Sequence, residues 1–181
     1  MKTNVTSYSA GSKAFHWLIS IIVITMLSLS FFLDGIPKQY QPVAYMIHKS
    51  AGLTVLFLMI ARFFWLQYCG KPALPPSVPR WQKIAAHFLH YSLYVGIICM
   101  ALFGWIMSVA AGKIPSYFGM FSLSLPIAPN KALSKLMNQS HKTMAWVLIV
   151  LIVLHIVAAI KHHFIDKDVV LKRMLPGHND R

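Results

Sequence analysis

Four long apolar stretches, separated by polar or proline-containing segments, constrain the fold of this chain more than any other feature. They cover about residues 14–33, 45–66, 84–111 and 143–165. Each has the roughly 20 residues that an α-helix needs to cross the hydrocarbon core of a bilayer. Because a chain in lipid must satisfy its backbone hydrogen bonds internally, each stretch is expected to form a helix. The sequence therefore predicts an all-α fold, a transmembrane four-helix bundle.

The composition and the breaks between the stretches agree with this fold. Hydrophobic residues make up 57% of the chain and charged residues 12%, whereas an ordinary soluble domain has about 25% charged residues. Asp34 to Pro37 ends the first stretch, and four prolines lie between the second and third. The longest connection, residues 112–140, is expected to hold a short interfacial segment around 117–125. We expect a single membrane domain over residues 1–181.

The charge distribution indicates how the chain lies in the membrane. The net charge is +13, but no basic stripe carries interleaved aromatic residues, so nucleic acid is not an expected partner. Eleven Lys and Arg, including Lys2 and Arg181, fall on the side of the two termini, against six on the other side. The excess predicts that both termini are cytoplasmic. The six residues on the far side are Lys38, Lys49, Lys113, Lys131, Lys135 and Lys142.

Histidines within the apolar stretches are the strongest indication of function, because an ionisable residue at membrane depth is costly. His141 and His155 are fourteen residues apart, close to four helical turns, so they share a helix face about 21 Å apart along the axis. One therefore lies towards each membrane surface. The nine histidines are His16, His48, His87, His90, His141, His155, His162, His163 and His178.

The alternating direction of the helices supplies a partner for each of these two histidines. It places His16 at the level of His155, and His48 at the level of His141. Two imidazoles from different helices can ligate one haem iron, and six-coordinate iron favours electron transfer over oxygen binding. The chain has no C-x-x-C-H motif for covalent attachment. The sequence therefore predicts two non-covalent b-type haems, with these four histidines as iron ligands.

Other readings of these histidines stay open. They are either ligands or buried side chains that bond to neighbouring helices. Zinc or copper is a chemical alternative, although two ligands at each site are fewer than zinc usually takes. His87 and His90 are alternative ligands, or pocket-lining residues, at the His16–His155 site.

Several further residues have both a functional and a structural interpretation. Arg62 is a candidate partner for a haem propionate, or it extends its side chain to the membrane surface. His162 is a candidate contact for a quinone headgroup, or it only marks the end of a helix. Three glycines give room either to a porphyrin or to plain helix packing. They are Gly52, Gly96 and Gly104.

The motifs around these histidines resemble those of the bacterial cytochrome b561 family, small four-helix di-haem membrane proteins. The resemblance covers nearly the whole chain. It rests on Phe15-His16-Trp17-Leu18, on residues 46–52 around His48, on Ala86-His87-Phe88-Leu89-His90, on Ser140-His141-Lys142, on Leu154-His155, and on residues 162–168 and 171–176.

This resemblance implies the same ligand pairs, and it implies a place in the bacterial inner membrane. Some family members are superoxide oxidases, which pass electrons from periplasmic superoxide to ubiquinone, and the match places His162 at the quinone. Lys142 stands where an acidic residue is expected in the family.

A superoxide:ubiquinone oxidoreductase is the leading functional hypothesis. The six far-side lysines would attract an anion as small as superoxide, with Lys135 and Lys142 as the candidate catalytic residues, or they are a solvated surface beside lipid headgroups. The alternative is a haem-bearing electron-transfer subunit that shuttles electrons between quinone and a docked redox protein, with residues 112–140 as the docking surface. A non-redox transporter would need more polar residues within the spans than this chain has.

Overall fold

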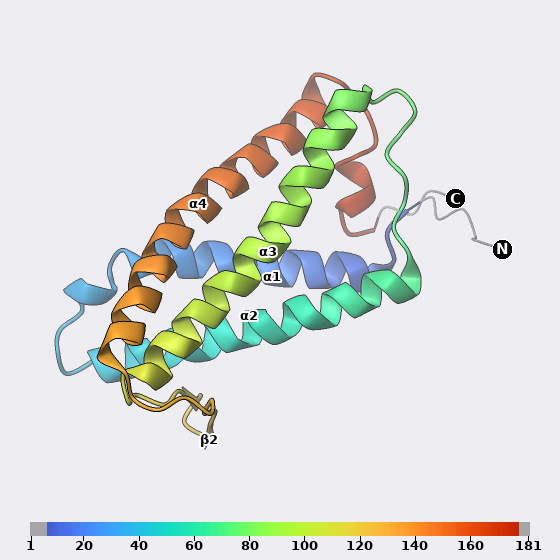
Figure 1. Ribbon diagram of the computed structural model, residues 1–181. Coiled ribbons are helices and arrows are strands. Elements are labelled where there is room, and N and C mark those ends of the chain that lie inside the picture. Colours follow the sequence, from blue (N-terminus) through green and yellow to red (C-terminus); the bar gives the residue numbers. More distant parts are fainter. Residues whose placement is uncertain (1–6, 178–181) are drawn as a thin grey trace.

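Four long helices dominate the computed structural model, which describes residues 7–177 (Figure 1). Each is long and apolar enough to cross a membrane, so the predicted all-α membrane fold is confirmed. Three residues named above, Lys2, His178 and Arg181, lie outside the described residues. The helices are α1 (Ala10–Ser30), α2 (Gln41–Cys69), α3 (Arg80–Ala110) and α4 (Lys131–Phe164).

Four small elements mark the two ends of the bundle. A short helix, η1 (Leu33–Gly35), and an antiparallel pair of strands, β1 (Ser116–Tyr117) and β2 (Phe121–Ser122), lie at one end, called here the hairpin end. The opposite end, called the terminal end, carries the start of α1, the end of α4 and η2 (Lys172–Met174). The expected interfacial segment therefore contains a β-hairpin.

Helix α4 begins at Lys131, twelve residues before the predicted start at 143. The first three turns are polar, so hydropathy alone does not reveal them. The Asn130 side chain caps the helix by accepting a hydrogen bond from the Leu133 amide at 3.0 Å, as N-cap residues do. At 34 residues the helix is roughly 50 Å long and extends beyond the hydrocarbon core.

The helices form two antiparallel pairs that cross each other (Figure 1). Helix α1 packs along α2, α3 packs along α4, and α2 joins the two pairs by packing against α3. Within residues 7–177, α4 packs closely against no helix except α3. Helix α4 therefore contacts the α1–α2 pair mainly through long side chains, such as Ile152, which packs on the buried cluster between α1 and α2.

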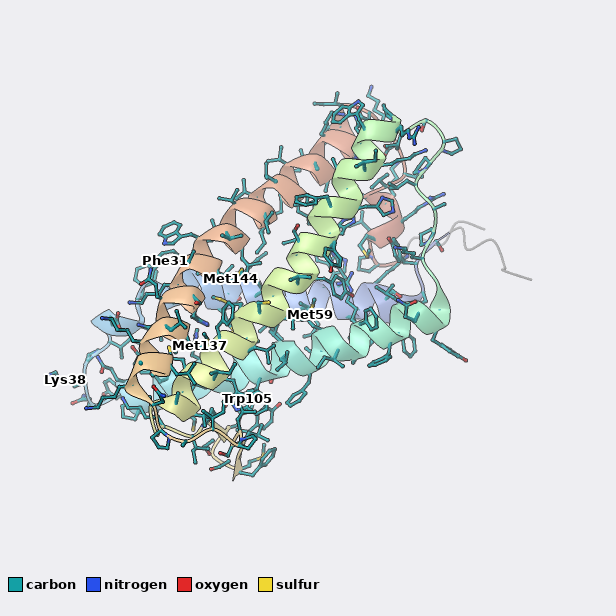
Figure 2. The ribbon with its side chains drawn as sticks, viewed as in Figure 1. Phe31, Lys38, Met59, Trp105, Met137 and Met144 are labelled. Atoms are coloured by element: carbon teal, nitrogen blue, oxygen red, sulfur yellow. The ribbon has the colours of Figure 1, made fainter. Side chains whose placement is uncertain are left out.

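The protein core lies mainly between α1 and α2. Ile19, Val23, Val55 and Met59 form a buried cluster there, and Figure 2 labels Met59. Many other large apolar side chains face outwards, as expected for helices in lipid.

Both ends of the bundle are tied by hydrogen bonds. At the hairpin end, Trp105, which is labelled in Figure 2, donates through Nε1 to the Leu123 carbonyl at 3.0 Å. At the terminal end, Trp17 donates through Nε1 to the Met174 carbonyl at 2.9 Å, and Arg173 donates to the Ala73 carbonyl at 3.0 Å. The C-terminal segment is thereby fixed to α1 and to the α2–α3 connection.

Candidate haem sites

The first candidate site lies at the hairpin end, where His48 of α2 faces His141 of α4. Their ring centroids are 6.3 Å apart and their planes are inclined at 72°. Nδ1 of His141 lies 2.9 Å from the Met100 carbonyl oxygen. A carbonyl only accepts, so Nδ1 carries the proton and donates it, which leaves the Nε2 lone pair for a metal.

A cavity of about 530 Å³ surrounds this pair of imidazoles. Its walls include His48, His141, Gly52 and Gly104. A Cβ at Gly104 would lie 3.1 Å from Cε1 of His141, so the glycine gives that ring its room. A Cβ at Gly52 would meet only Met26, at an ordinary 3.7 Å. A Cβ at Gly96 would instead lie 2.9 Å from the Leu148 side chain, so Gly96 serves the packing of α3 on α4.

The second candidate site lies at the terminal end, where His16 of α1 faces His155 of α4. Their ring centroids are 6.2 Å apart, at 76°. His90 of α3 joins them, 5.2 Å from the His155 ring. His87 is turned to the backbone, with Nδ1 donating to the Lys83 carbonyl at 2.6 Å. Sequence periodicity did not distinguish these two histidines, whereas the structure brings only His90 to the site.

Arg62 and Tyr94 complete the terminal-end site. Arg62 donates from Nη1 to Nδ1 of His16 at 3.0 Å, and its guanidinium lies 5.7 Å from the centre of the Tyr94 ring. Arg62 Nε and the Tyr94 hydroxyl are buried without a hydrogen-bond partner. The hydroxyl of Tyr94 is a feature that the sequence analysis did not anticipate.

These unpartnered groups suit an anionic ligand. No carboxylate among the described residues forms an ion pair with Arg62, and a buried charge without a counter-ion is costly. A carboxylate such as a haem propionate would supply the missing charge and acceptor. Since Arg62 donates to His16 Nδ1, the proton of the neutral His16 ring is on Nε2. His16 can therefore bind a metal through Nε2 only after Arg62 turns away and the ring proton moves to Nδ1.

The spacing of both histidine pairs fits an iron between them. Two imidazoles that ligate one metal ion from opposite sides, through bonds of about 2.0 Å, have ring centroids about 6 Å apart. The two pairs have 6.3 and 6.2 Å. Each pair also joins α4 to a helix that α4 does not pack against closely, and the hairpin-end pair lines a cavity of about 530 Å³. The donor set thus fits two bis-imidazole haems.

His162 lies two turns beyond His155, at the end of α4. Its Nδ1 is 2.6 Å from Asp168 Oδ2 and 3.3 Å from Asp166 Oδ2. No ring contact joins it to His16 or His155 among the contacts of the described residues. The structure therefore places His162 beside the terminal-end site without bringing it into the histidine cluster.

The structure places two of the six far-side lysines at the cavity of the hairpin-end site. Lys49 and Lys142 line the cavity of the hairpin-end site, and Lys49 Nζ donates to the Lys113 carbonyl at 3.5 Å. Lys135 is exposed on α4, two turns before Lys142, and does not line that cavity. Of the two candidate catalytic lysines, only Lys142 is at the site itself.

Comparison with known proteins places this arrangement in a family. The family model for prokaryotic cytochrome b561 matches residues 7–177. Cytochrome b561 homolog 2 of Escherichia coli (strain K12) is 35% identical over 170 residues, which are 93% of this chain and 90% of the relative. Cytochrome b561 homolog 1 of the same organism is 31% identical over 163 residues, 89% of this chain and 92% of the relative.

A third relative carries a more specific name. The probable superoxide oxidase CybB of Yersinia pestis is 32% identical over 172 residues, 93% of this chain and 96% of the relative. The residues matched by the family model include all four helices and both histidine pairs. The chain therefore belongs to the prokaryotic cytochrome b561 family, whose members are haem-b-binding, multi-pass membrane proteins of bacterial electron transfer.

Proposed function

We propose that this protein is a di-haem superoxide:ubiquinone oxidoreductase of the bacterial inner membrane, with both termini cytoplasmic. The observation that carries the proposal is the presence of two facing imidazole pairs, His48–His141 and His16–His155, at opposite ends of one helix. Bound haem iron would supply a one-electron carrier at each end. Two superoxide ions would give two electrons and leave two O₂, while ubiquinone and two protons would become ubiquinol.

The residues at the hairpin end suit an anionic electron donor. Lys49 and Lys142 flank the His48–His141 pair in one cavity. Asp34 is the one acidic residue among residues 7–177 that lines it, and its carboxylate accepts a hydrogen bond from Tyr45 at 2.7 Å. Fixed positive charge at the mouth of a low-dielectric cavity raises the local concentration of a small anion. Lys135 would add to this positive potential from a position on α4 two turns before Lys142.

The residues at the terminal end suit haem anchoring and quinone reduction. His16 and His155 would ligate the iron, and Arg62 with Tyr94 would bind a propionate. His162 would contact the quinone headgroup, two helical turns further towards the membrane surface. The name of the Yersinia pestis relative, a probable superoxide oxidase, agrees with this reaction.

Charge reversal at the donor side tests the proposal. Changing Lys135 and Lys142 together to Glu should slow haem reduction by pulse-generated superoxide roughly 10-fold without changing haem content. In the parent protein the rate should fall as salt rises, because the Debye length shrinks from about 30 Å at 0.01 M to about 10 Å at 0.1 M. The matched control is Lys71→Glu with Lys172→Glu, which makes the same change at the terminal end. A rate that depends on neither salt nor Lys135 and Lys142 would refute superoxide as the donor.

A second candidate function is a haem-bearing subunit that shuttles electrons between quinone and a redox protein. The β-hairpin favours it, because the side chains of Phe118, Met120 and Phe121 are 45%, 69% and 52% exposed at its tip. An apolar tip at the membrane surface would offer a docking site for a protein. Stoichiometric copurification of a redox partner, lost when Met120 and Phe121 are changed to Ser, would support this function over the first.

A further inference from the structure

A histidine and an aspartate form a tightly fixed pair at the end of α4. Nδ1 of His162 lies 2.6 Å from Oδ2 of Asp168, and the two side chains are 13% and 11% exposed. The other carboxylate oxygen, Oδ1, accepts a hydrogen bond from the Val170 amide at 2.9 Å. The Asp168 amide in turn donates to the His162 carbonyl at 3.1 Å. Both the carboxylate and its backbone are therefore held in place over the helix end.

This contact determines which ring nitrogen of His162 is available. An ionised carboxylate only accepts hydrogen bonds, so Nδ1 carries a proton and donates it to Asp168. Nε2 is then the nitrogen that can exchange a proton with a ligand. Asp166 is bound differently, since Lys161 Nζ contacts its two oxygens at 2.8 and 2.6 Å and it lies 3.3 Å from His162 Nδ1.

The pair lies between solvent and the terminal-end site. Asp166 and Asp168 line a small pocket of about 280 Å³ together with Gln82, whose Oε1 is buried without a hydrogen-bond partner. On the other side, His162 follows His155 by seven residues on roughly the same helix face, about 10 Å along the axis. A quinone reduced beside the His16–His155 site would need protons, and the His162–Asp168 pair is placed near both that site and this pocket.

We infer that Asp168 is the positioning residue that fixes His162 as the proton donor to the quinone. The inference rests on the proposed function, since it specifies how ubiquinone obtains its protons. In the transfer, the Nε2–H bond of the doubly protonated His162 ring breaks and an O–H bond forms on the quinone. The neutral imidazole keeps its Nδ1–H on Asp168, and a hydronium ion from bulk solvent returns a proton to Nε2 and leaves as water. Two such transfers accompany the two electrons that arrive through the haems.

Replacing Asp168 by Asn would reverse the tautomer of His162. The amide oxygen could still accept from the Val170 amide, but the amide NH₂ would then face His162 Nδ1. Nδ1 would have to accept that hydrogen bond, which moves the single proton of the neutral ring to Nε2. The ring could then become doubly protonated only by giving up this hydrogen bond, so the form that donates a proton to the quinone would be disfavoured. The change keeps size and shape, so it tests the hydrogen bond and not the packing.

The experiment measures two steps separately in detergent-solubilised holoprotein. The first is haem reduction by pulse-generated superoxide, and the second is steady-state reduction of a short-chain ubiquinone. Asp168→Asn should lower kcat for ubiquinone by about 10-fold or more, since positioned general acids contribute at least that much. KM, haem content, the reduced spectrum and the rate of haem reduction should not change. Asp168→Glu restores an acceptor and should recover part of kcat.

Asp166→Asn is the matched control, because it removes the same charge from the same pocket and leaves the His162–Asp168 hydrogen bond in place. It should change kcat by less than about 2-fold, as expected for an exposed ion pair. Equal losses in the two Asn variants, or no loss in Asp168→Asn, would overturn the inference.

His162→Ala separates this inference from the proposed function. If it lowers kcat while Asp168→Asn does not, only the role of Asp168 is wrong. If the parent protein reduces no ubiquinone, or if His162→Ala leaves kcat unchanged, the proposed quinone site is wrong and the inference fails with it.

Discussion

The imidazoles of His48 and His141 face each other at a centroid distance of 6.3 Å, although α2 and α4, the helices that carry them, do not pack closely together. The same is true of His16 and His155 on α1 and α4. Both pairs therefore bridge the space between the two helix pairs of the bundle. A metal cofactor at either position would connect α4 to the other half of the molecule.

The two sites should be separable by single substitutions. His141→Ala should remove or misligate the hairpin-end haem only, and His155→Ala the terminal-end haem only, because each histidine belongs to one pair. A pyridine haemochrome assay should give two haems per chain for the parent and about one for each variant. Loss of both haems from either variant, in a protein that remains folded, would contradict independent sites.

His90 and His87 should behave differently although they are one turn apart. The His90 ring lies 5.2 Å from that of His155, so His90→Ala should shift the midpoint potential of the terminal-end haem without removing it. His87 donates to a backbone carbonyl on its own helix, so His87→Ala should leave both potentials unchanged. Redox titration of the haem absorbance distinguishes the two, and loss of the terminal-end haem in His87→Ala would mean that the ligand pairs are misassigned.

Gly104 should be more sensitive to alanine than Gly52, although both line the same cavity. A Cβ at Gly104 meets the His141 ring at 3.1 Å, whereas one at Gly52 meets a methionine methyl at 3.7 Å. Gly104→Ala should therefore displace His141 and alter the spectrum and potential of the hairpin-end haem. Gly52→Ala should have little effect, and equal effects would indicate that general crowding of the cavity is responsible.

Arg62 and Tyr94 should set the properties of the terminal-end haem. A buried positive charge destabilises ferric iron relative to ferrous iron. Arg62→Met removes this charge, so the midpoint potential of the terminal-end haem should fall. The Tyr94 hydroxyl has no partner within the protein and would donate a hydrogen bond to the propionate. Tyr94→Phe removes that donor and should weaken haem retention during detergent washing. Tyr91→Phe is the control, since that side chain is 71% exposed and should have no effect on either quantity.

Ser50 should contribute to stability by fixing the β-hairpin to α2. Its hydroxyl is fully buried; it accepts from the Phe118 amide at 2.9 Å and donates to the Met46 carbonyl at 2.8 Å. Ser50→Ala would leave the Phe118 amide unpaired, which costs about 1–3 kcal/mol. Thermal unfolding in detergent should show a lower Tm, with Ser122→Ala, at an exposed position of the hairpin, as the unchanged reference.

The four helices were predictable because lipid allows few alternatives for a long apolar stretch. Pairing of the histidines also followed from the sequence, since helix direction and a fourteen-residue spacing fix their depth. The start of α4 did not follow from hydropathy, because eight of its first twelve residues are polar or charged. The cap at Asn130, before a run of good helix formers, was the signal that would have located it.

Contacts that depend on rotation about a helix axis were not accessible from the sequence. His87 and His90 differ only in the direction in which α3 points them, and that direction is set by packing against α2 and α4. The Arg62–Tyr94 and His162–Asp168 contacts join residues whose approach depends on helix crossing and on the fold of the C-terminal segment. The β-hairpin was not predictable for a different reason. Its two strands have only two residues each, and the turn between them places Phe118 and Gly119 at positive φ.

The weak packing of α4 against α1 and α2 has a consequence for biogenesis. In the α1–α2 pair and in the α3–α4 pair, each helix satisfies its own backbone hydrogen bonds, so each pair can enter the bilayer as a helical hairpin. The two hairpins then associate through the packing of α2 against α3. Haem held between the facing imidazoles would add a second connection, from α4 to α1 and α2. The prosthetic groups would in this way act on two hairpins that are already inserted in the membrane.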